Sequence, residues 1–270
     1  MLIKIVKMKK INYKHFNKID STNLWAKENL KTFDRNSSYI ITADSQSNGQ
    51  GSKSRNWHSP EGGLYCTICI PLTESKKNIH TLSLLTGICI SDTLSNNNNN
   101  NNNICISDTL SNDNIDIQLK WPNDLILNNK KIGGILSESI IENNINWLII
   151  GFGINMNTKF EDIEAINRPL YPASSIYIET KKYISNDIFI DAFIKNFNEL
   201  FEEWLKDGFT NFIEKYNQKN ILINKFVEIS YGDLIKFGSF YGIGNNGELL
   251  LTTPIGPETF YNGDIIRVFG

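Results

Sequence analysis

Residues 120–138, KWPNDLILNNKKIGGILSE, contain the pattern that decides the fold. Two short apolar runs, DLIL and IGGIL, are separated by Asn-Asn-Lys-Lys, a composition typical of the turn in a β-hairpin. Pro122 fixes a turn just before the first run. We therefore expect two antiparallel strands here, with the turn before them and the second strand meeting at one end of the hairpin.

The end of this predicted hairpin has the residue types of a ligand site. Asn123 and Asp124 place an amide and a carboxylate at the tip of the turn fixed by Pro122. The second strand then brings Lys131 back beside them. Gly133 and Gly134 leave space for a ligand. A lysine among apolar strands needs a counter-charge, which Asp124 or a bound anion could supply. On these residues alone, an ordinary hairpin with a surface Lys-Lys turn is an equal alternative.

Apolar runs on both sides of the hairpin predict further strands of one sheet, namely YIITAD, LYCTICIPL, IDIQLKW and WLIIGFGINM. Helical patterns interrupt them. DSTNLWAKENLKTF has apolar residues at helical spacing after N-capping residues, and residues 186–216 form a long amphipathic pattern broken near Gly208. A sheet with segregated helices indicates an α+β fold, in which a mixed β-sheet domain carries the helices packed on it.

The pattern changes after about residue 220, where short strands alternate with glycine-containing turns. We expect a first domain over residues 1–220 and a small β-barrel over residues 221–270. The second part contains GIGNNG, which satisfies the dinucleotide pattern GxGxxG. Because a strand-like ELLL follows it instead of a helix, we interpret it as a hairpin turn.

Composition limits the classes of protein to consider. The chain has 270 residues, 40% of them hydrophobic, with a net charge of −2 and a pI of about 6.0. This balance gives no support to bulk nucleic-acid binding. The longest apolar runs are too short to cross a bilayer, and the N-terminus resembles the start of a strand more than a signal peptide. We expect a cytoplasmic protein without membrane or nucleic-acid partners.

The spacing of the cysteines does not favour a metal site. Cys66 and Cys69 form a CxxC within an apolar run, and core packing is the favoured interpretation because no second ligand pair has suitable spacing.

The segment ICISDTLSN occurs twice, and the first copy continues a helical pattern. The asparagine run between the copies, residues 96–103, predicts a disordered loop without an assigned function.

Two glycine-containing stretches could join the hairpin in one site. In DSQSNGQGSKSRNWHSP, Gly49 and Gly51 would let backbone N–H groups curl around an anion, while Lys53 and Arg55 add positive charge. Composition alone favours a solvated loop. The strand IIGFGINMN contains two glycines, which predict close approach of backbone, helix or ligand.

Taken together and in this order, these motifs resemble the catalytic core of biotin protein ligases. The matching pieces are DSTN at residues 20–23, QxxGxG from Gln46, KWPND with the downstream KIGGIL, and GxGINMN. The resemblance implies a class II aminoacyl-tRNA synthetase/biotin ligase-like fold and a C-terminal SH3-like barrel. It also implies the monofunctional type, because the sequence leaves no room for an N-terminal helix-turn-helix domain.

The resemblance implies a reaction in two steps. The biotin carboxylate attacks the α-phosphorus of ATP to give biotinyl-5′-AMP, and a lysine of a biotin carboxyl carrier protein then displaces AMP. Two anions must meet, so cations and N–H donors have to offset their repulsion. ATP, Mg²⁺ and biotin are the expected small molecules, without a fixed metal site on the protein. A homodimer is possible in this family.

The resemblance also assigns residues to roles. Lys131 and Asp124 would be catalytic. Biotin would be bound by Ser21, Thr22, Asn23, Gln46, Gly49, Gln50, Lys131, Gly134 and Gly151. ATP would be bound by Gly51, Ser52, Lys53, Arg55, Trp57, Asn123, Lys131 and Asn155.

The sequence departs from the family in one loop. That loop usually reads GRGRxGR, but here Gln50 and Ser52 occupy the positions of two arginines. We hypothesise that Lys53 or Arg55 partly compensates and that biotinyl-AMP is held less tightly than usual. Two alternatives remain: a lipoate or octanoate ligase or transferase, and a non-catalytic binding module.

Overall fold

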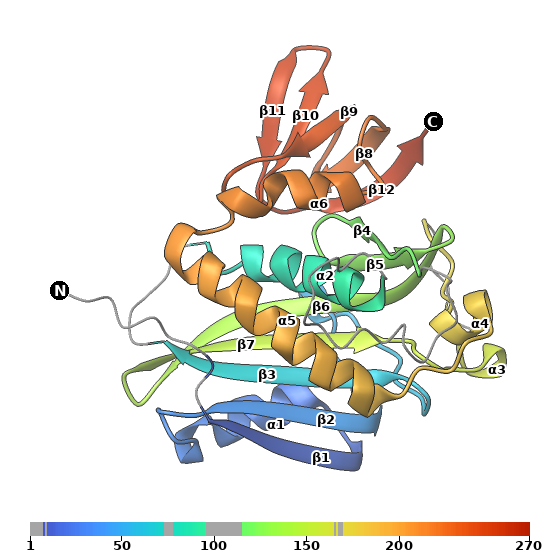
Figure 1. The fold of residues 1–270 in the computed structure, drawn as a ribbon. Helices are drawn as coiled ribbons and strands as arrows, with labels where there is room; N and C mark the ends of the chain where they lie inside the picture. The colour runs from blue at the N-terminus through green and yellow to red at the C-terminus, as the bar shows by residue number, and fades with distance from the viewer. Residues whose placement is uncertain (1–7, 9, 73–77, 96–114, 165, 167–169) are drawn as a thin grey trace.

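The computed structural model describes residue 8 and residues 10–72, 78–95, 115–164, 166 and 170–270. It is a mixed α+β structure, as predicted, with a large sheet, helices on both of its faces and a smaller C-terminal sheet (Figure 1). The predicted asparagine loop, the second ICISDTLSN copy and most of the N-terminal segment lie outside the described residues.

The large sheet has the strand order β1-β2-β3-β7-β6-β5-β4. β1 and β2 are parallel, and every other neighbouring pair is antiparallel. Its strands are β1 (Ile11–Ile19), β2 (Ser38–Gln46), β3 (Leu64–Leu72), β4 (Gln118–Lys120), β5 (Asp124–Leu127), β6 (Lys130–Glu142) and β7 (Ile145–Ile154). The strands expected from the apolar runs are therefore confirmed, whereas most of β1 was not anticipated.

The hairpin predicted from residues 120–138 is confirmed as β5 and β6. Asn128 and Asn129 form its turn with φ values of 50° and 59°, which asparagine tolerates better than most residues. The register places Asp124 opposite Gly134 and Ile126 opposite Lys131. Consequently, the whole of β5 lies beside the first part of β6, which brings Asp124 close to Lys131.

Helices cover both faces of the large sheet (Figure 1). They are α1 (Thr22–Asn29), α2 (Thr81–Leu94), α3 (Phe160–Ile163), α4 (Ile176–Thr180), α5 (Asn186–Asp207) and α6 (Ile213–Lys219), with short 3-10 turns at Leu30–Thr32, Ser52–Ser54 and Thr210–Phe212. α1 packs on one face through a small cluster that includes Ala26 and Leu30, and α2 and α5 pack on the other. Both predicted helical regions are confirmed, and α5 ends at Gly208 as expected.

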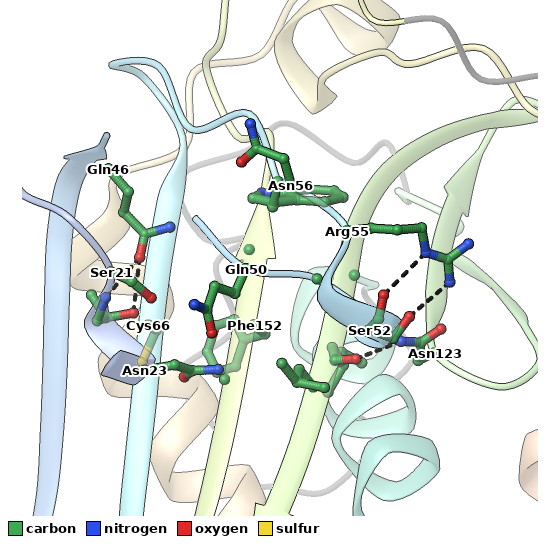
Figure 2. A pocket seen from close by; sticks show the side chains of 18 of the residues that line it. Ser21, Asn23, Gln46, Gln50, Ser52, Arg55, Asn56, Cys66, Asn123 and Phe152 are labelled. Carbon is green, nitrogen blue, oxygen red and sulfur yellow. Dashed lines mark hydrogen bonds between the residues drawn. The ribbon is translucent and has the colours of Figure 1, made fainter. Parts of the chain in front are cut away.

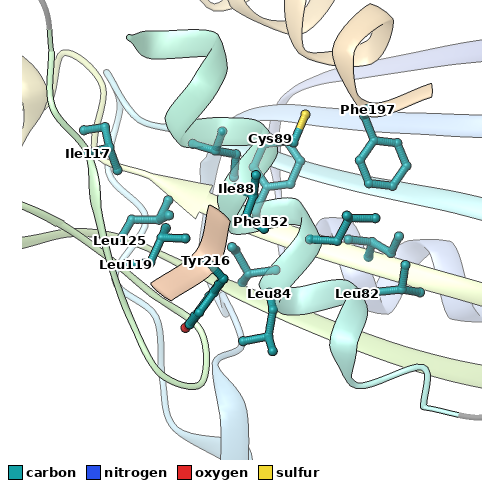
Figure 3. Packing of buried hydrophobic residues seen from close by; sticks show 14 of the residues in the cluster. Leu82, Leu84, Ile88, Cys89, Ile117, Leu119, Leu125, Phe152, Phe197 and Tyr216 are labelled. Carbon is teal, nitrogen blue, oxygen red and sulfur yellow. The ribbon is translucent and has the colours of Figure 1, made fainter. Parts of the chain in front are cut away.

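The main core lies around α2, which is buried on nearly all sides (Figure 3). A helix that is apolar all round is stable only inside a protein. α5 covers it with aromatic rings four residues apart, Phe189, Phe193, Phe197 and Phe201, whose neighbouring centroids are 5.4–5.8 Å apart. Residues 88–94 of the first ICISDTLSN copy thus form the second half of α2.

The C-terminal sheet has the order β11-β10-β9-β8-β12, with antiparallel neighbours. Its strands are β8 (Phe226–Tyr231), β9 (Leu234–Ile243), β10 (Leu249–Thr253), β11 (Gly256–Phe260) and β12 (Asp264–Phe269). GIGNNG joins β9 to β10, so the prediction of a hairpin turn is confirmed. Within residues 221–270, all of which are described, β11 and β12 are the two edges of this sheet.

The two sheets share one apolar core. Val227, Ile229 and Phe240 of the smaller sheet belong to the same buried cluster as α2 and α5. The buried Trp121 donates its Nε1–H to the carbonyl oxygen of Gly247 at 2.9 Å. The boundary between residues 220 and 221 stays a prediction, and these contacts show how closely the two parts are joined.

Other expectations concern buried cysteines and membrane helices. Cys66 and Cys69 are buried in β3, as core packing predicts, and Cys89 is also free and buried. In the described part of the chain, no helix is long and apolar enough to cross a membrane.

Candidate functional site

A pocket opens where the N-terminus of α1, the loop after β2 and the starts of β5 and β6 meet the end of β7 (Figure 2). Figure 2 shows Gln46 and Ser21 on one side, and Arg55, Ser52 and Asn123 on the other. The residues lining it are Ser21, Thr22, Asn23, Gln46, Gln50, Gly51, Ser52, Arg55, Asn56, Trp57, Cys66, Asn123, Asp124, Lys131, Gly134, Ile135, Leu136, Gly151, Phe152 and Gly153.

A hydrogen-bond network shapes the end of the pocket formed by α1. Ser21 is the N-cap of α1, and its side chain accepts a hydrogen bond from Leu24 N–H. Thr22 donates to Gln46 Oε1 through its backbone N–H at 2.8 Å and its hydroxyl at 3.1 Å. The buried Thr67 hydroxyl lies 2.9 Å from Thr22 Oγ1 and 2.5 Å from Asn23 Oδ1. These bonds fix polar groups around one end of the pocket.

Gly151 allows α1 to sit this close to the sheet. A Cβ atom at this position would lie 2.2 Å from Asn23 Oδ1 and 2.4 Å from Asn23 Nδ2. No ordinary side chain fits such a distance without displacing the asparagine. The glycine that the sequence pattern singled out in β7 therefore permits the close approach of a helix residue that itself lines the pocket.

The loop after β2 folds back on itself beside the pocket. Gly49 O accepts a hydrogen bond from Trp57 N–H at 2.8 Å, and Gly51 N–H donates to Arg55 O at 2.7 Å. A Cβ atom on Gly49 would be 2.5 Å from Trp57 O, so the crossing requires glycine there. The predicted curled loop is present, although Gly49 supports it from behind and does not line the pocket.

The tip of this loop contacts the C-terminal sheet. Lys53 and Ser54 both have φ values of 57°, an uncommon conformation for residues other than glycine. Lys53 Nζ lies 2.8 Å and Arg55 Nη2 3.1 Å from the two carboxylate oxygens of Asp264. Arg55 also donates to Ser52 Oγ at 2.8 Å. The two cations expected to bind a nucleotide are thus ion-paired to Asp264, and Lys53 does not line the pocket.

Trp57 closes the loop over the sheet. A Cβ atom on Gly153 would lie 2.6 Å from Trp57 Nε1, which shows how closely the indole covers β7. The ammonium group of Lys131 is 5.5 Å from the centroid of the Trp57 ring, within the range of a cation–π contact. The indole therefore lies beside a lysine that lines the pocket.

The charged centre of the site is one carboxylate between two lysines. Asp124 Oδ1 pairs with Lys131 Nζ, and Asp124 Oδ2 pairs with Lys120 Nζ at 2.6 Å. Burial alone would raise the pKa of Asp124, but the two ammonium groups outweigh burial and hold this pKa well below its usual range. The expected pairing of Lys131 with Asp124 is present, and Lys120 is an additional partner.

A second, smaller hollow lies on the other side of Trp57 and Lys131. Its lining residues are Trp57, His58, Lys131, Asn155, Ile166 and Ala173. Asn155 donates from Nδ2 to Ser174 O at 2.8 Å, while its buried Oδ1 has no hydrogen-bond partner among the described residues. A buried acceptor without a partner is costly, so a donor group of a ligand in this hollow would stabilise it.

Fourteen of the residues expected from the sequence line the main pocket, whereas Gly49 and Lys53 line neither hollow and Asn155 lines the second one. Asn123 is present but binds the backbone: its Nδ2 donates to Ile135 O at 2.7 Å. The lining residues that were not expected from the sequence are Asn56, Cys66, Ile135, Leu136, Phe152 and, in the second hollow, His58, Ile166 and Ala173. Most are ordinary strand or loop residues. Nothing in their local sequence indicates that the fold brings them to the pocket.

Metal binding finds no support in the donor set. Among the residues that the structure describes, no group of three or more His, Cys, Asp or Glu side chains could hold a metal ion. The carboxylate that lines the main pocket, Asp124, already pairs with two lysines. A metal ion would have to arrive with a ligand that supplies its own oxygen atoms.

Fold and site together define an α+β protein with a pocket that is polar at one end and cationic in the middle. The chain belongs to the Biotin/lipoate A/B protein ligase family, whose model matches residues 15–155. This range contains the hairpin with Lys131 and the glycines of the two other stretches.

Curated relatives agree with this assignment. The chain is 26% identical over 228 residues to the Bifunctional ligase/repressor BirA of Bacillus subtilis, which covers 84% of this chain and 65% of that protein. It is 24% identical over 230 residues to the Biotin--[acetyl-CoA-carboxylase] ligase of Paracoccus denitrificans, which covers 83% of this chain and 90% of that protein. The chain thus spans about two thirds of the length of the bifunctional relative and most of the length of the other.

Solved structures share the fold over nearly the whole chain. The biotin protein ligase from Aquifex aeolicus in complex with biotin and ATP matches with a TM-score of 0.73 and 25% identity, covering 97% of this chain and 99% of that chain. The biotin protein ligase from Leishmania major in complex with biotinyl-5-AMP matches in fold, with a TM-score of 0.61 and 22% identity over 93% of this chain and 99% of that chain.

Proposed function

We propose that this protein joins biotin to a lysine of a biotin carboxyl carrier protein through biotinyl-5′-AMP. The observation that carries the proposal is the position of Lys131, which lines both the main pocket and the second hollow. A cation at the junction of two hollows can contact the reacting ends of two ligands. The similarity to a ligase structure that contains biotin and ATP supports the same assignment.

We place the biotin ring at the α1 end of the main pocket. Ser21, Thr22, Asn23 and Gln46 supply hydroxyl and amide groups there, which match the donors and acceptors of a ureido ring. Gly151 forms the floor under Asn23, and Gln50 and Gly134 continue the wall toward Lys131. A polar end of this kind suits biotin better than the aliphatic chain of a lipoyl or octanoyl group, which makes a lipoate ligase or transferase the second candidate.

We place ATP across Lys131 and Trp57. The α-phosphate would lie at Lys131 and beside Gly51 and Ser52, with Arg55 at the side. The adenine ring would enter the second hollow, where its amino group could donate to Asn155 Oδ1. Mg²⁺ would accompany the polyphosphate as part of the substrate, where it offsets negative charge.

Lys131 has a defined role in the first step. A biotin carboxylate oxygen attacks the α-phosphorus, and the bond from this phosphorus to pyrophosphate breaks. The ammonium group offsets the repulsion between the two anions as they approach. The acceptor amine then attacks the anhydride carbonyl carbon, AMP leaves, and the amine loses a proton. Asp124 is the nearest carboxylate that could orient this incoming amine.

Incubation with ATP, Mg²⁺, biotin and a biotin carboxyl carrier domain tests the proposal. We expect mass spectrometry to show one biotinyl adduct on one lysine of the carrier domain, and no adduct without ATP. The free, buried cysteines fit a reducing compartment, and we place the reaction in the cytoplasm. An unmodified carrier domain under these conditions would refute the assignment.

Two further measurements separate the alternatives. Isothermal titration with biotin and with lipoate tests substrate choice, and tighter binding of lipoate would favour the second candidate. A non-catalytic binding module would not need its lysine for turnover. We expect Lys131→Ala to lower biotin-dependent pyrophosphate release by at least 100-fold, and unchanged release would reject the role of this lysine.

A further inference from the structure

Lys120 is the unexplained member of the charged centre. It ends β4, its side chain is 9% exposed, and its ammonium group lies 2.6 Å from Asp124 Oδ2. Lys120 does not line the pocket, whereas Asp124 and Lys131 do. Burying the charge of a lysine is unfavourable in free energy unless the lysine is paired. The position of Lys120 behind the residues that line the pocket therefore needs an explanation.

The arrangement gives Asp124 two partners on opposite oxygens. Lys131 pairs with Oδ1 and Lys120 with Oδ2, so the three side chains carry a net charge of +1. If Lys131 turns toward a substrate anion, Asp124 keeps the ammonium group of Lys120. Without Lys120, the departure of Lys131 would leave a buried carboxylate unpaired, which is strongly unfavourable.

We propose that Lys120 is a positioning residue. It keeps its ion pair with Asp124 when Lys131 leaves that carboxylate, and Lys131 is thereby released to contact the reacting carboxylate and phosphate. This inference rests on the proposed function and extends it to a residue outside the pocket. Lys120 acts through Asp124 and touches no substrate.

The role of Lys120 has a pH signature. The titratable groups that face or influence Asp124 are Lys120 on β4, Lys131 on β6, Tyr171 in the loop before α4 and Tyr216 on α6. Burial and the charge of Asp124 raise the pKa of both tyrosines, so they remain neutral in the acid range. If Lys120 is removed, the carboxylate binds a proton at higher pH once Lys131 has turned away.

The test is a double-mutant cycle on biotin-dependent ATP–pyrophosphate exchange, with Lys120→Met and Asp124→Asn. We expect Lys120→Met to lower kcat/KM for ATP at least tenfold and to move the acid limb of the kcat profile up by one pH unit or more. In the Asp124→Asn background, the same change should cost less than twofold. Equal losses in both backgrounds, or an unmoved acid limb, would overturn the inference.

The chain offers a matched control elsewhere. Asp92 also lies between two lysines, with Lys215 Nζ at 2.5 Å and Lys219 Nζ at 3.2 Å, and none of the three lines the pocket. Lys219→Met therefore removes one of two lysines from a buried aspartate without touching the site. We expect it to keep exchange within twofold of the wild type. A loss as large as that of Lys120→Met, at equal thermal stability, would count against a specific role.

Failure of the inference differs from failure of the proposed function. If the wild type shows no biotin-dependent exchange, the proposed function is wrong and the positioning role of Lys120 falls with it. If the wild type exchanges pyrophosphate while Lys120→Met behaves like Lys219→Met, only the inference is wrong.

Discussion

At the scale of single residues, Gly151 gives the sharpest expectation. A methyl group there would collide with the side-chain amide of Asn23, which is hydrogen-bonded to the buried Thr67. We expect Gly151→Ala to weaken biotin binding at least tenfold and to cost about 1–3 kcal/mol of unfolding free energy, the usual range for overpacking. Calorimetric titration with biotin and urea unfolding measure the two effects.

Gly134→Ala provides the contrast for this experiment. A Cβ atom at Gly134 would have no neighbour closer than 3.6 Å, an ordinary contact distance. We expect a smaller loss of biotin affinity than for Gly151→Ala. Equal losses at both positions would show that the collision with Asn23 is not the cause.

The lowered pKa of Asp124 predicts how the free energy of unfolding changes at acid pH. Its pKa is lowered in the folded protein by Lys120 and Lys131, against the effect of burial. A group with a lowered folded pKa contributes stability above its unfolded pKa, about 3.9, and loses that contribution as the pH falls toward the folded value. We expect Asp124→Asn to cost about 3–5 kcal/mol at pH 7, the range for breaking a buried ion pair. Urea unfolding should show this difference narrowing below about pH 4, and a constant difference would contradict the pairing.

Sequence reasoning at this scale succeeded where one chemical need pointed to one partner. A lysine between apolar strands required a counter-charge, and Asp124 was available across a predictable two-residue turn. Lys120 was missed as a partner because its position depends on the turn through Pro122, which brings β4 back beside β5. Thr67 was missed because a threonine inside an apolar strand has no local signal for a contact with α1.

At the scale of elements, the loop after β2 joins the pocket to the C-terminal sheet. Two left-handed residues at its tip, Lys53 and Ser54, are each unfavourable by about 1–3 kcal/mol, so other contacts must hold the tip. Asp264 provides such contacts through Lys53 and Arg55. We expect Asp264→Asn to increase the dissociation rate of biotinyl-AMP severalfold, measured by stopped-flow fluorescence of Trp57 and its neighbours.

The change should affect the loop more than global stability, because the ion pairs of Asp264 are substantially exposed. Glu228→Gln is the matched control: it removes the partner of Arg267 in the same sheet, away from the loop. We expect the control to leave dissociation unchanged. Identical dissociation from Asp264→Asn and the wild type would show that Asp264 does not restrain the loop.

The elements themselves were largely predictable, but the path of this loop was not. Strands β3, β5, β6 and β7 follow from apolar runs bounded by glycine and asparagine, and α5 from its helical periodicity. The loop composition predicted curling and positive charge. It could not show that the charge of Lys53 is directed to Asp264, because that contact joins residues 211 positions apart.

At the scale of the whole molecule, the shared core argues against independent folding of the two sheets. Trp121 directly follows Lys120, a residue of the charged centre. It is 1% exposed and donates a hydrogen bond to Gly247 of the smaller sheet. The composition change near residue 220 correctly indicated a new sheet. It could not reveal the joint core, because burial depends on which faces meet.

The joint core predicts a single cooperative unit. Removal of residues 221–270 would expose Trp121 and Tyr216, and burial of large aromatic side chains contributes several kcal/mol to unfolding free energies of about 5–15 kcal/mol. We expect one calorimetric transition for the full chain, shifted upward as a whole by biotin and ATP, and no cooperative transition for residues 1–220 alone. Trp121→Phe, which replaces the indole by a smaller phenyl ring and removes the hydrogen bond to Gly247, should lower the midpoint without splitting the transition. Two separate transitions, with ligand moving only the first, would show that the two sheets fold independently.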